Sequence, residues 1–368
     1  LRGFTDALDG NGAMRLALEL QVPLRRSDDT TLTGRLSFLG DTLFPSGLPR
    51  LEQVRGDIDF THDSLDAKNL SAQFLGGPLR IDTATHNGQV QILAQGRATA
   101  AGLAPWLGKT WDRRLSGQTN WRGQIDLEPK GERVRVESDL AGLGSSLPAP
   151  LAKTAAQPLP LVVISQPQGD GQLHEVRLGR TVSAVWRSTA TAGFSRGEIR
   201  FGGQAVMPTE PGLRLAGSGR GMDISGWVAL LPRGDGQEAL PLSSIDLSFD
   251  ALDLMGRRYQ DVRLLGRNRN GLLRTQVTGH ELNGVLTYRP ASASDSSGTS
   301  ARSGAESLRE QPARVSAQFR QLTIPARAPE TGGADGMSMK AADFPILDVS
   351  VEDFRLQERS LGRLEVMA

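Results

Sequence analysis

The chain has 368 residues and no cysteine, and its 42 lysines and arginines balance 41 aspartates and glutamates to a net charge of +1. This length allows two or three ordinary domains or one large β body. Without cysteine, disulfides, thiolate metal sites and cysteine nucleophiles are excluded. The basic residues are scattered singly among acids, so the clustered basic stripe of a nucleic-acid binder is missing and no nucleic-acid partner is expected.

Glycine is frequent, at 43 residues, and aromatic residues make up only 5% of the chain. Many strands joined by tight turns give this balance. No stretch reaches the ~18 apolar residues of a membrane-spanning helix. The chain opens at Leu1 without an initiator methionine and stops at Ala368 within a strand-like alternation. We therefore expect a fragment whose targeting and anchoring segments lie elsewhere in a longer protein.

Alternation with period two dominates from the N-terminus onward. Met14, Leu16, Leu18 and Leu20 fall on one face of a strand, and Arg15 and Glu19 fall on the other. The same pattern predicts long strands over residues 65–75, 89–99, 115–127 and 272–278. Turn signals separate the strands at residues 75–78, 87–88, 268–271 and 283–284.

Helical patterning is limited to residues 103–107 and 224–231. Each stretch contains one tryptophan, Trp106 or Trp227. We interpret both as short helices at the end of a sheet, held there by the tryptophan as an apolar anchor.

An internal repeat relates two segments 102 positions apart. Leu247 and Phe249 correspond to Val349 and Val351, and both copies change the phase of their alternation directly after the second residue. Because one extra residue moves the pattern to the other face, the phase change predicts a β-bulge in each copy. The repeat indicates a modular, solenoid-like protein.

Two segments lack periodicity. Residues 290–312 are rich in serine, and residues 325–345 are rich in glycine, alanine and proline. Neither can bury enough apolar surface to offset the entropy of ordering, so we expect mobile loops. The predicted organisation is a β body over 1–289, mobile loops over 290–345 around a strand at 313–324, and a further β-repeat starting at 346–368.

One segment matches a catalytic motif. Residues 193–197 read Gly-x-Ser-x-Gly, with Ser195 in the position of a nucleophile. A nucleophile elbow needs a helix after it, but Glu198-Ile199-Arg200-Phe201 alternates as a strand with a wet polar face. We therefore expect a hairpin turn with an inert serine, and no catalytic residue.

Other motifs also lack the spacing that chemistry requires. Residues 217–221 are glycine-rich, but they have neither dinucleotide-binding nor P-loop spacing, so no cofactor is expected. Two Arg-Gly-Asp triplets, at 55–57 and 233–235, are accounted for by the composition of the chain. The four histidines, which are His62, His86, His174 and His280, are too dispersed for a metal site, and we predict none.

The residues alone predict an all-β fold of long antiparallel strands with a few short helices. Such half-apolar strands can form either an open trough or a closed sandwich with a dry core. The second form would be a structural or adhesive scaffold.

Several segments resemble the YhdP branch of the bacterial AsmA-like proteins. These segments are residues 143–153 (LGSSLPAPLAK) with Pro158-Leu159, residues 344–354 (FPILDVSVEDF) with 359–364, and residues 56–77, the last resembling a β-repeat shared with AsmA and TamB. The resemblance extends over most of the chain.

The resemblance implies a periplasmic β body curled into an open, elongated, repeating groove, with an inner-membrane anchor outside this chain. It further implies a lipid-transfer bridge that carries phospholipid between the inner and outer membranes of a Gram-negative bacterium and supports the outer-membrane barrier. The implied partners are phospholipid acyl chains, both membranes and a protein at the outer membrane, without cofactor or catalysis. The cleanest apolar stripes are the predicted groove lining: Met14, Leu16, Leu18, Leu20, Leu247, Phe249, Val349 and Val351.

Overall fold

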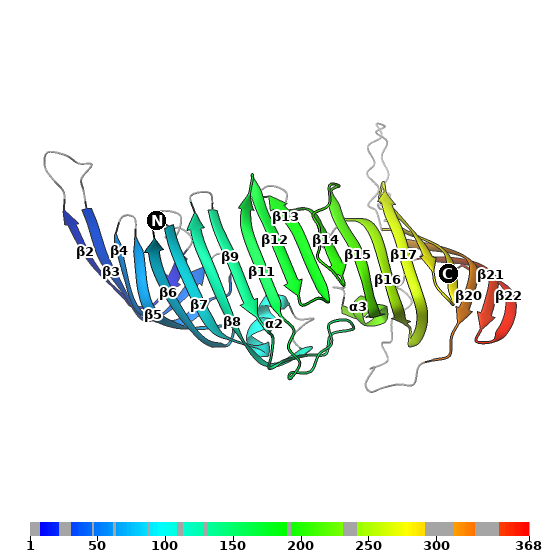
Figure 1. Ribbon diagram of the computed structural model, residues 1–368, viewed down its shortest axis with the longest axis horizontal. Helices are drawn as coiled ribbons and strands as arrows, with labels where there is room; N and C mark the ends of the chain where they lie inside the picture. The colour runs from blue at the N-terminus through cyan, green and yellow to red at the C-terminus, as the bar shows by residue number, and fades with distance from the viewer. Residues whose placement is uncertain are drawn as a thin grey trace, which may run out of the picture. The chain divides into compact units, whose positions relative to one another are not determined.

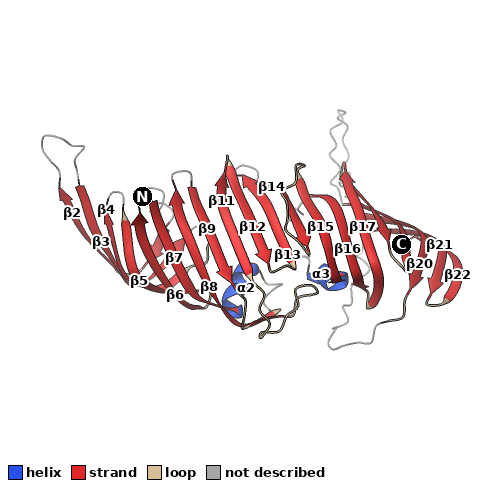
Figure 2. Ribbon diagram, viewed as in Figure 1, coloured by secondary structure: helices blue, strands red, loops and turns tan. Residues whose placement is uncertain are grey.

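The computed structural model describes residues 8–21, 31–45, 48–61, 64–86, 89–108, 113–128, 131–189, 193–230, 241–290, 313–327 and 346–367. The chain forms two compact units. Unit 1 comprises Leu1–Leu147 and Leu151–Ser195, and unit 2 comprises Pro148–Pro150 and Arg196–Ala368. Strands dominate both units (Figure 2).

Unit 1 is an antiparallel sheet with one short helix. Its elements are β1 (Leu8–Asn11), β2 (Met14–Gln21), β3 (Thr31–Pro45), β4 (Leu51–Thr61), β5 (Leu65–Phe74), β6 (Gly77–His86), β7 (Gln89–Thr99), α2 (Ala100–Leu107), β8 (Leu115–Glu128), β9 (Gly131–Ser138), β10 (Leu143–Ser145), β11 (Leu161–Gln168), β12 (Gly171–Leu178) and β13 (Val182–Thr189). The strands pair in chain order from β2 to β9, and β11 then joins β9 and is followed by β12 and β13 (Figure 1). β1 extends the β2 side of the sheet along β3, and β10 pairs with the start of β8.

The helix α2 follows β7, close to the predicted stretch. The Thr99 hydroxyl caps it by accepting a hydrogen bond from the amide of Gly102 at 3.0 Å. Ala104 is the buried residue of the helix, whereas Trp106 is 59% exposed. At about 100° per residue, Trp106 lies nearly opposite Ala104 on the helix, so the anchoring role predicted for this tryptophan is wrong.

Unit 2 contains a mixed sheet. Its elements are the main part of β14 (Gly193–Phe201), β15 (Gly212–Asp223), α3 (Ile224–Leu230), β16 (Leu242–Leu254), β17 (Arg257–Arg269), β18 (Leu272–Thr278), β19 (Leu282–Arg289), β20 (Arg314–Ile324), β21 (Ile346–Leu356) and β22 (Arg359–Met367). The strands pair in chain order, and the pairs β14–β15, β15–β16 and β20–β21 are parallel. The all-β prediction is confirmed, but the antiparallel prediction is wrong for these three pairs. Each pair is joined by a connection long enough to return the chain to the same end of the sheet.

In unit 2, the predicted helix after β15 is α3, and its tryptophan is anchored. Trp227 packs against the cluster of Met222, Leu247 and Phe249. Its indole N–H also donates to the carbonyl of Ala149 at 2.8 Å.

Most strand predictions agree with the structure to within a residue, including β5, β7, β8 and β18. The turns at Leu75-Gly76 and Asn270-Gly271 have positive φ at both residues, as a two-residue hairpin requires. The turn predicted at Asn283-Gly284 is wrong, because both residues lie inside β19. Gly284 instead makes room for Phe319, since a Cβ there would lie 2.4 Å from the Phe319 ring. The turn predicted at 87–88 lies outside the described residues.

The predicted repeat has a structural counterpart. β15–β16–β17 and β20–β21–β22 share one arrangement, a parallel pair followed by an antiparallel hairpin. The β21–β22 register shifts directly after Val351, as the phase change predicts. The burial pattern of β16 also changes phase after Phe249. The register between β16 and β17 is nevertheless kept, because β17 changes phase at the facing position. This change occurs at Asp261, which has φ +50°.

β20 occupies the position of the strand predicted at 313–324. Residues 291–312 and 328–345 lie outside the described residues, so the loops expected there and the boundary at 289/290 stay predictions. Neither α2 nor α3, the helices of the described residues, is long and apolar enough to cross a bilayer.

Candidate functional site

The most extended chemical feature of unit 1 is one apolar face of its sheet. Cross-strand partners share a face, so the register identifies which side chains lie side by side. One row crosses β5, β6, β7, β8, β9, β11, β12 and β13 through Leu70, Ile81, Ala94, Gly123, Val136, Val163, Val176 and Ala184. No polar side chain interrupts this row. We call the face that contains it the apolar face of unit 1.

Burial differs along the apolar face. At β3 to β7 it is closely packed, in a cluster that includes Ile58, Ala67 and Leu70, which are 9% exposed or less. At β9 to β13 the row residues Val136, Val163, Val176 and Ala184 are all partly exposed. The inner face of a closed sandwich would be buried throughout, so this part of the sheet presents apolar surface that a ligand can reach.

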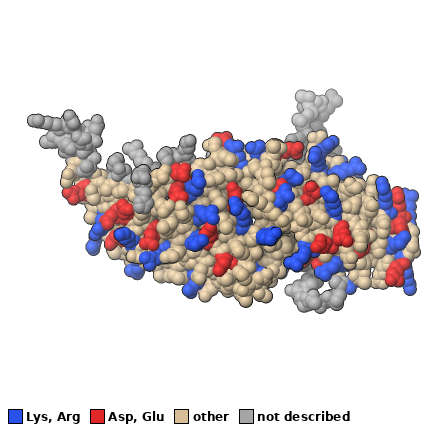
Figure 3. Space-filling view, viewed as in Figure 1, with Lys and Arg blue, Asp and Glu red and all other residues tan. Residues whose placement is uncertain are grey.

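The opposite face carries charged side chains in compensating pairs. Arg35 binds Asp59 across β3 and β4 through two hydrogen bonds, at 2.6 and 3.0 Å. This contact raises the pKa of Arg35 and lowers that of Asp59. In the view of Figure 3, basic and acidic side chains are intermixed over the visible surface. Such a face suits solvent contact rather than a single charged partner.

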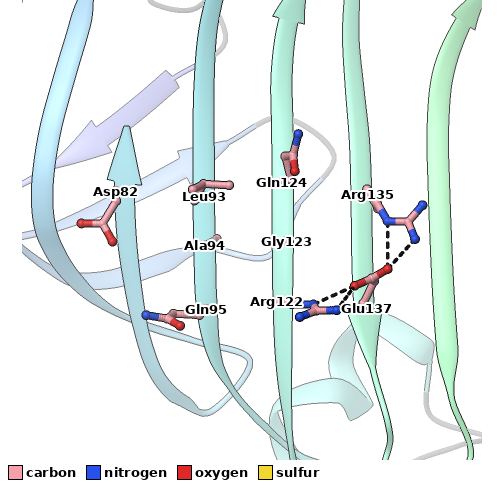
Figure 4. Close-up of a pocket in the computed structure, with 9 residues that line it drawn as sticks. All are labelled: Asp82, Leu93, Ala94, Gln95, Arg122, Gly123, Gln124, Arg135 and Glu137. Atoms are coloured by element: carbon pink, nitrogen blue, oxygen red, sulfur yellow. Dashed lines mark hydrogen bonds and ion pairs between the residues drawn. The ribbon is translucent and has the colours of Figure 1, made fainter. Parts of the chain in front are cut away.

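A shallow depression of about 410 Å³ lies on this charged face (Figure 4). Glu137 on β9 accepts hydrogen bonds from Arg122 Nε at 2.7 Å and from Arg135 Nε at 2.9 Å. These two contacts lower the pKa of Glu137, so the carboxylate is ionised at neutral pH and satisfies both guanidinium groups. Asp82 also lines the depression, so two acidic side chains balance the two arginines. The depression is therefore a self-compensated cluster of charges, not an anion-binding site.

The predicted lining residues of β2 form an exposed apolar stripe. Met14, Leu16, Leu18 and Leu20 are 50–60% exposed. The first two pair with Phe38 and Leu36 of β3, which places the stripe on the face that also contains Ile58. The structure thus brings these four residues onto the apolar face of unit 1.

The predicted lining residues of unit 2 share one face as well. Leu247 and Val351 belong to a single cross-strand row that continues from Leu247 through Leu264, Val277, Gly284 and Phe319 to Val351. Leu247, Phe249 and Val351 are 7%, 2% and 0% exposed, whereas Val349 is partly exposed. Contact of these residues with lipid stays a prediction.

Sequence reasoning missed the central part of the apolar face. Residues 161–164 read Leu-Val-Val-Ile, which has no alternation, so β11 gave no signal of which side chains share a face. In the structure, the cross-strand partners of Val163, which are Val136 and Val176, show which side chains of β11 lie on the apolar face. The alternation around Val134 and Val136 was the one available signal.

Ser195 lies within β14, near its start, rather than at a strand-to-helix turn. Its hydroxyl donates to the carbonyl oxygen of Arg187 on β13 at 3.1 Å. The serine therefore helps to join two strands, and the backbone around it differs from a nucleophile elbow. In the part of the chain that the structure describes, no three histidine, aspartate or glutamate side chains gather as a metal site.

Residues 143–153, which carry part of the family resemblance, form a loop whose two ends are hydrogen-bonded to each other. Ser145 and Lys153 pair through their backbones. The Lys153 ammonium donates to the carbonyl oxygens of Leu140, at 2.9 Å, and Leu143. Burial lowers the pKa of this ammonium. The lysine thus acts as a structural clamp within the loop.

The two units define an all-β protein whose sheets each carry a continuous apolar face. The family model described as YhdP protein matches residues 1–368, and the chain belongs to this family, as the resemblance implied. It is 25% identical over 304 residues to the "Intermembrane phospholipid transporter YhdP" of Escherichia coli (strain K12). The match covers 76% of this chain and 23% of that protein, so the chain spans about a quarter of its relative. No solved structure matches the chain.

Proposed function

We propose that this chain is a non-catalytic segment of a lipid-transfer bridge that spans the periplasm. In this proposal, phospholipid acyl chains move along the apolar face of unit 1 and the corresponding face of unit 2. The observation that carries the proposal is the uninterrupted row from Leu70 to Ala184, whose β9 to β13 part is partly exposed. The relative named as an intermembrane phospholipid transporter supports the choice of cargo.

Energetics favour a continuous surface over a discrete pocket. Exposing an acyl chain to water costs about 0.8 kcal/mol per CH₂, or ~12 kcal/mol for a chain of ~15 methylenes. A gap in the apolar surface would be a barrier of that order to a moving lipid. The charged opposite face keeps such a sheet soluble in an aqueous compartment.

The setting follows from the same proposal. The parent protein is anchored in the inner membrane of a Gram-negative bacterium, and this segment lies in the periplasm. The bridge supplies phospholipid to the outer membrane and so supports its barrier, with a protein partner at that membrane.

Photo-crosslinking in the full-length parent protein tests the proposal. A photoreactive amino acid at Val163 should capture phospholipid in living cells, because this side chain is on the apolar face. The same amino acid at Ile164, its neighbour on the opposite face, should capture little. Equal capture at the two positions would contradict the proposal.

The second candidate is a structural or adhesive β scaffold. The buried cluster at β3 to β7 favours it, because Ile58, Ala67 and Leu70 are packed as in a dry core. A scaffold would yield no phospholipid at either Val163 or Ile164.

A further inference from the structure

The apolar face of unit 1 changes character over β11, β12 and β13. Next to the row of Val163, Val176 and Ala184 lies a parallel row of Ser165, His174 and Trp186. One step further, towards the β11–β12 turn, Gln172 pairs with Ser188. Side chains two residues apart on a strand share a face, so this group belongs to the apolar face. We call it the polar station, and it consists of Ser165, Gln172, His174, Trp186 and Ser188.

The polar station is held together by specific contacts. The His174 ring stacks on the Trp186 ring, with centroids 4.9 Å apart and planes inclined by 22°. His174 Nε2 and Ser188 Oγ lie 2.9 Å apart in a hydrogen bond. All five residues are partly exposed, so the station forms part of the accessible surface.

The station also contains an unsatisfied group. Gln172 Oε1 is buried and accepts no hydrogen bond from the described residues. A buried acceptor without a donor is costly, and such atoms concentrate where a ligand or water completes the site. A water molecule that donates one hydrogen to this atom and the other to an ester carbonyl would satisfy both acceptors.

The charge of the surroundings selects the chemistry of the ligand. The arginines of these strands, which are Arg133, Arg135, Arg177 and Arg187, alternate onto the opposite face. On the station's own face, Glu132 is the acidic side chain near the β8–β9 turn. Burial lowers the pKa of His174, which keeps the ring neutral at pH 7. Among the described residues of this face, a phosphate would thus meet no cation beside the station. Neutral donors and acceptors beside a tryptophan suit ester carbonyls and hydroxyls at a boundary between polar and apolar groups.

We propose that the polar station binds the glycerol-ester region of a diacyl glycerolipid, whose acyl chains lie against Val163, Val176 and Ala184. This inference rests on the proposed function and deepens it. It gives the lipid one orientation on the sheet, with the polar part towards the β11–β12 turn and the chains away from it. The station is a resting point on the path of the acyl chains.

Two phospholipid probes test the orientation in the full-length parent protein. One carries a diazirine on the first carbons of an acyl chain, close to the ester, and the other carries it at the chain terminus. After photolysis, peptide mapping should find the ester-proximal probe at the polar station. The terminal probe should be found away from the station, on the apolar rows. Terminal labelling of the station at least as strong as ester-proximal labelling would overturn the inference while leaving lipid transfer intact. Absence of both labels from unit 1 would overturn the proposed function together with the inference.

A double variant tests the residues themselves. His174→Leu with Ser188→Ala removes the hydrogen-bonding groups, each worth about fivefold in occupancy, so the ester-proximal preference should be lost. Glu175→Gln, on the same strand but the opposite face, is the matched control and should keep it. Ser165→Ala should give a smaller loss in the same direction and serves as the test if the double variant does not fold. Unchanged preference in a folded double or Ser165→Ala variant would contradict the assignment.

Discussion

The ring of Phe201 meets the ring of Phe249 edge-on, with centroids 5.7 Å apart and planes at 71°. The two residues lie on β14 and β16, and β15 runs between them. Gly217 pairs with Phe201 and Gly219 pairs with Phe249, so β15 offers no side chain at these positions. A Cβ on Gly219 would lie 3.2 Å from the Phe249 ring. The glycine-rich segment 217–221 thus makes room for aromatic packing within a strand.

Gly217→Ala should destabilise unit 2 strongly. Gly217 has φ +106°, and a Cβ there would lie 2.0 Å from the Phe201 carbonyl oxygen. Gly271→Ala is the matched control, because Gly271 has φ +77° with nothing within 4 Å of its Cβ position. We expect the control to lose about 1–2 kcal/mol of unfolding free energy from backbone strain alone, and Gly217→Ala to lose more. Chemical denaturation measures both, and equal losses would show that the close approach is unimportant.

Phe249→Ala should cost about 3–5 kcal/mol of unfolding free energy, because Phe249 is 2% exposed and its removal leaves a cavity. Leu265→Ala, at a 48% exposed position on β17, should change stability by less than about 0.5 kcal/mol. Thermal and urea unfolding of both variants tests this. If Phe249→Ala lowered the unfolding free energy by less than about 1 kcal/mol, the surroundings of this ring would be open to solvent or lipid.

Glu198 should stabilise the connection between β14 and β15. Its side chain is 0% exposed and forms ion pairs with Arg200 and Arg214. Its carboxylate also accepts a hydrogen bond from the backbone amide of Val206 at 3.1 Å. Glu198→Ala should cost about 3 kcal/mol, since it removes one partner of a buried ion pair. Glu198→Gln keeps a hydrogen-bond acceptor for Val206. Its unfolding free energy should therefore lie between those of Glu198→Ala and the wild type. Limited proteolysis should cut residues 202–211 faster in the alanine variant, and an unchanged rate would contradict this role.

Stability should fall as the pH drops below 6.5 because of His174. Burial lowers its pKa below the ordinary 6.5, so the unfolded chain binds a proton before the folded chain does. The stability is therefore complete above pH 6.5 and is lost as pH falls through the folded pKa. The lowered pKa of Glu137 affects stability only below about pH 4.5. The melting temperature of His174→Gln should depend less on pH than that of His280→Gln, the exposed control, and identical profiles would exclude His174.

Much of the fold could be predicted because alternation is a local signal. β7 and β18 occupy the predicted residues, and Asn270-Gly271 forms the predicted turn, since short-range sterics determine both. The parallel pairs could not be predicted, because they depend on where a long connection returns the chain. Glu198 looked like a residue of a wet face, yet the connection after β14 covers it.

The site was only partly predictable for a related reason. The exposed stripe from Met14 to Leu20 is visible in the sequence because its apolar residues alternate along a single strand. The polar station is not visible, because Ser165, His174 and Trp186 come from three strands. Only the register brings them into one row.

The most direct test of the central claim compares Val163→Asp with Ile164→Asp in the full-length parent protein. Val163 lies in the apolar row, whereas Ile164 lies on the opposite face between Arg135 and Glu175. A buried or lipid-covered charge is costly, so an aspartate at 163 should interrupt the path of the acyl chains. The measurement is phospholipid transfer between the two membranes, with folding checked by circular dichroism. We predict that folded Val163→Asp loses transfer and that Ile164→Asp retains it, whereas full transfer by Val163→Asp would contradict the account.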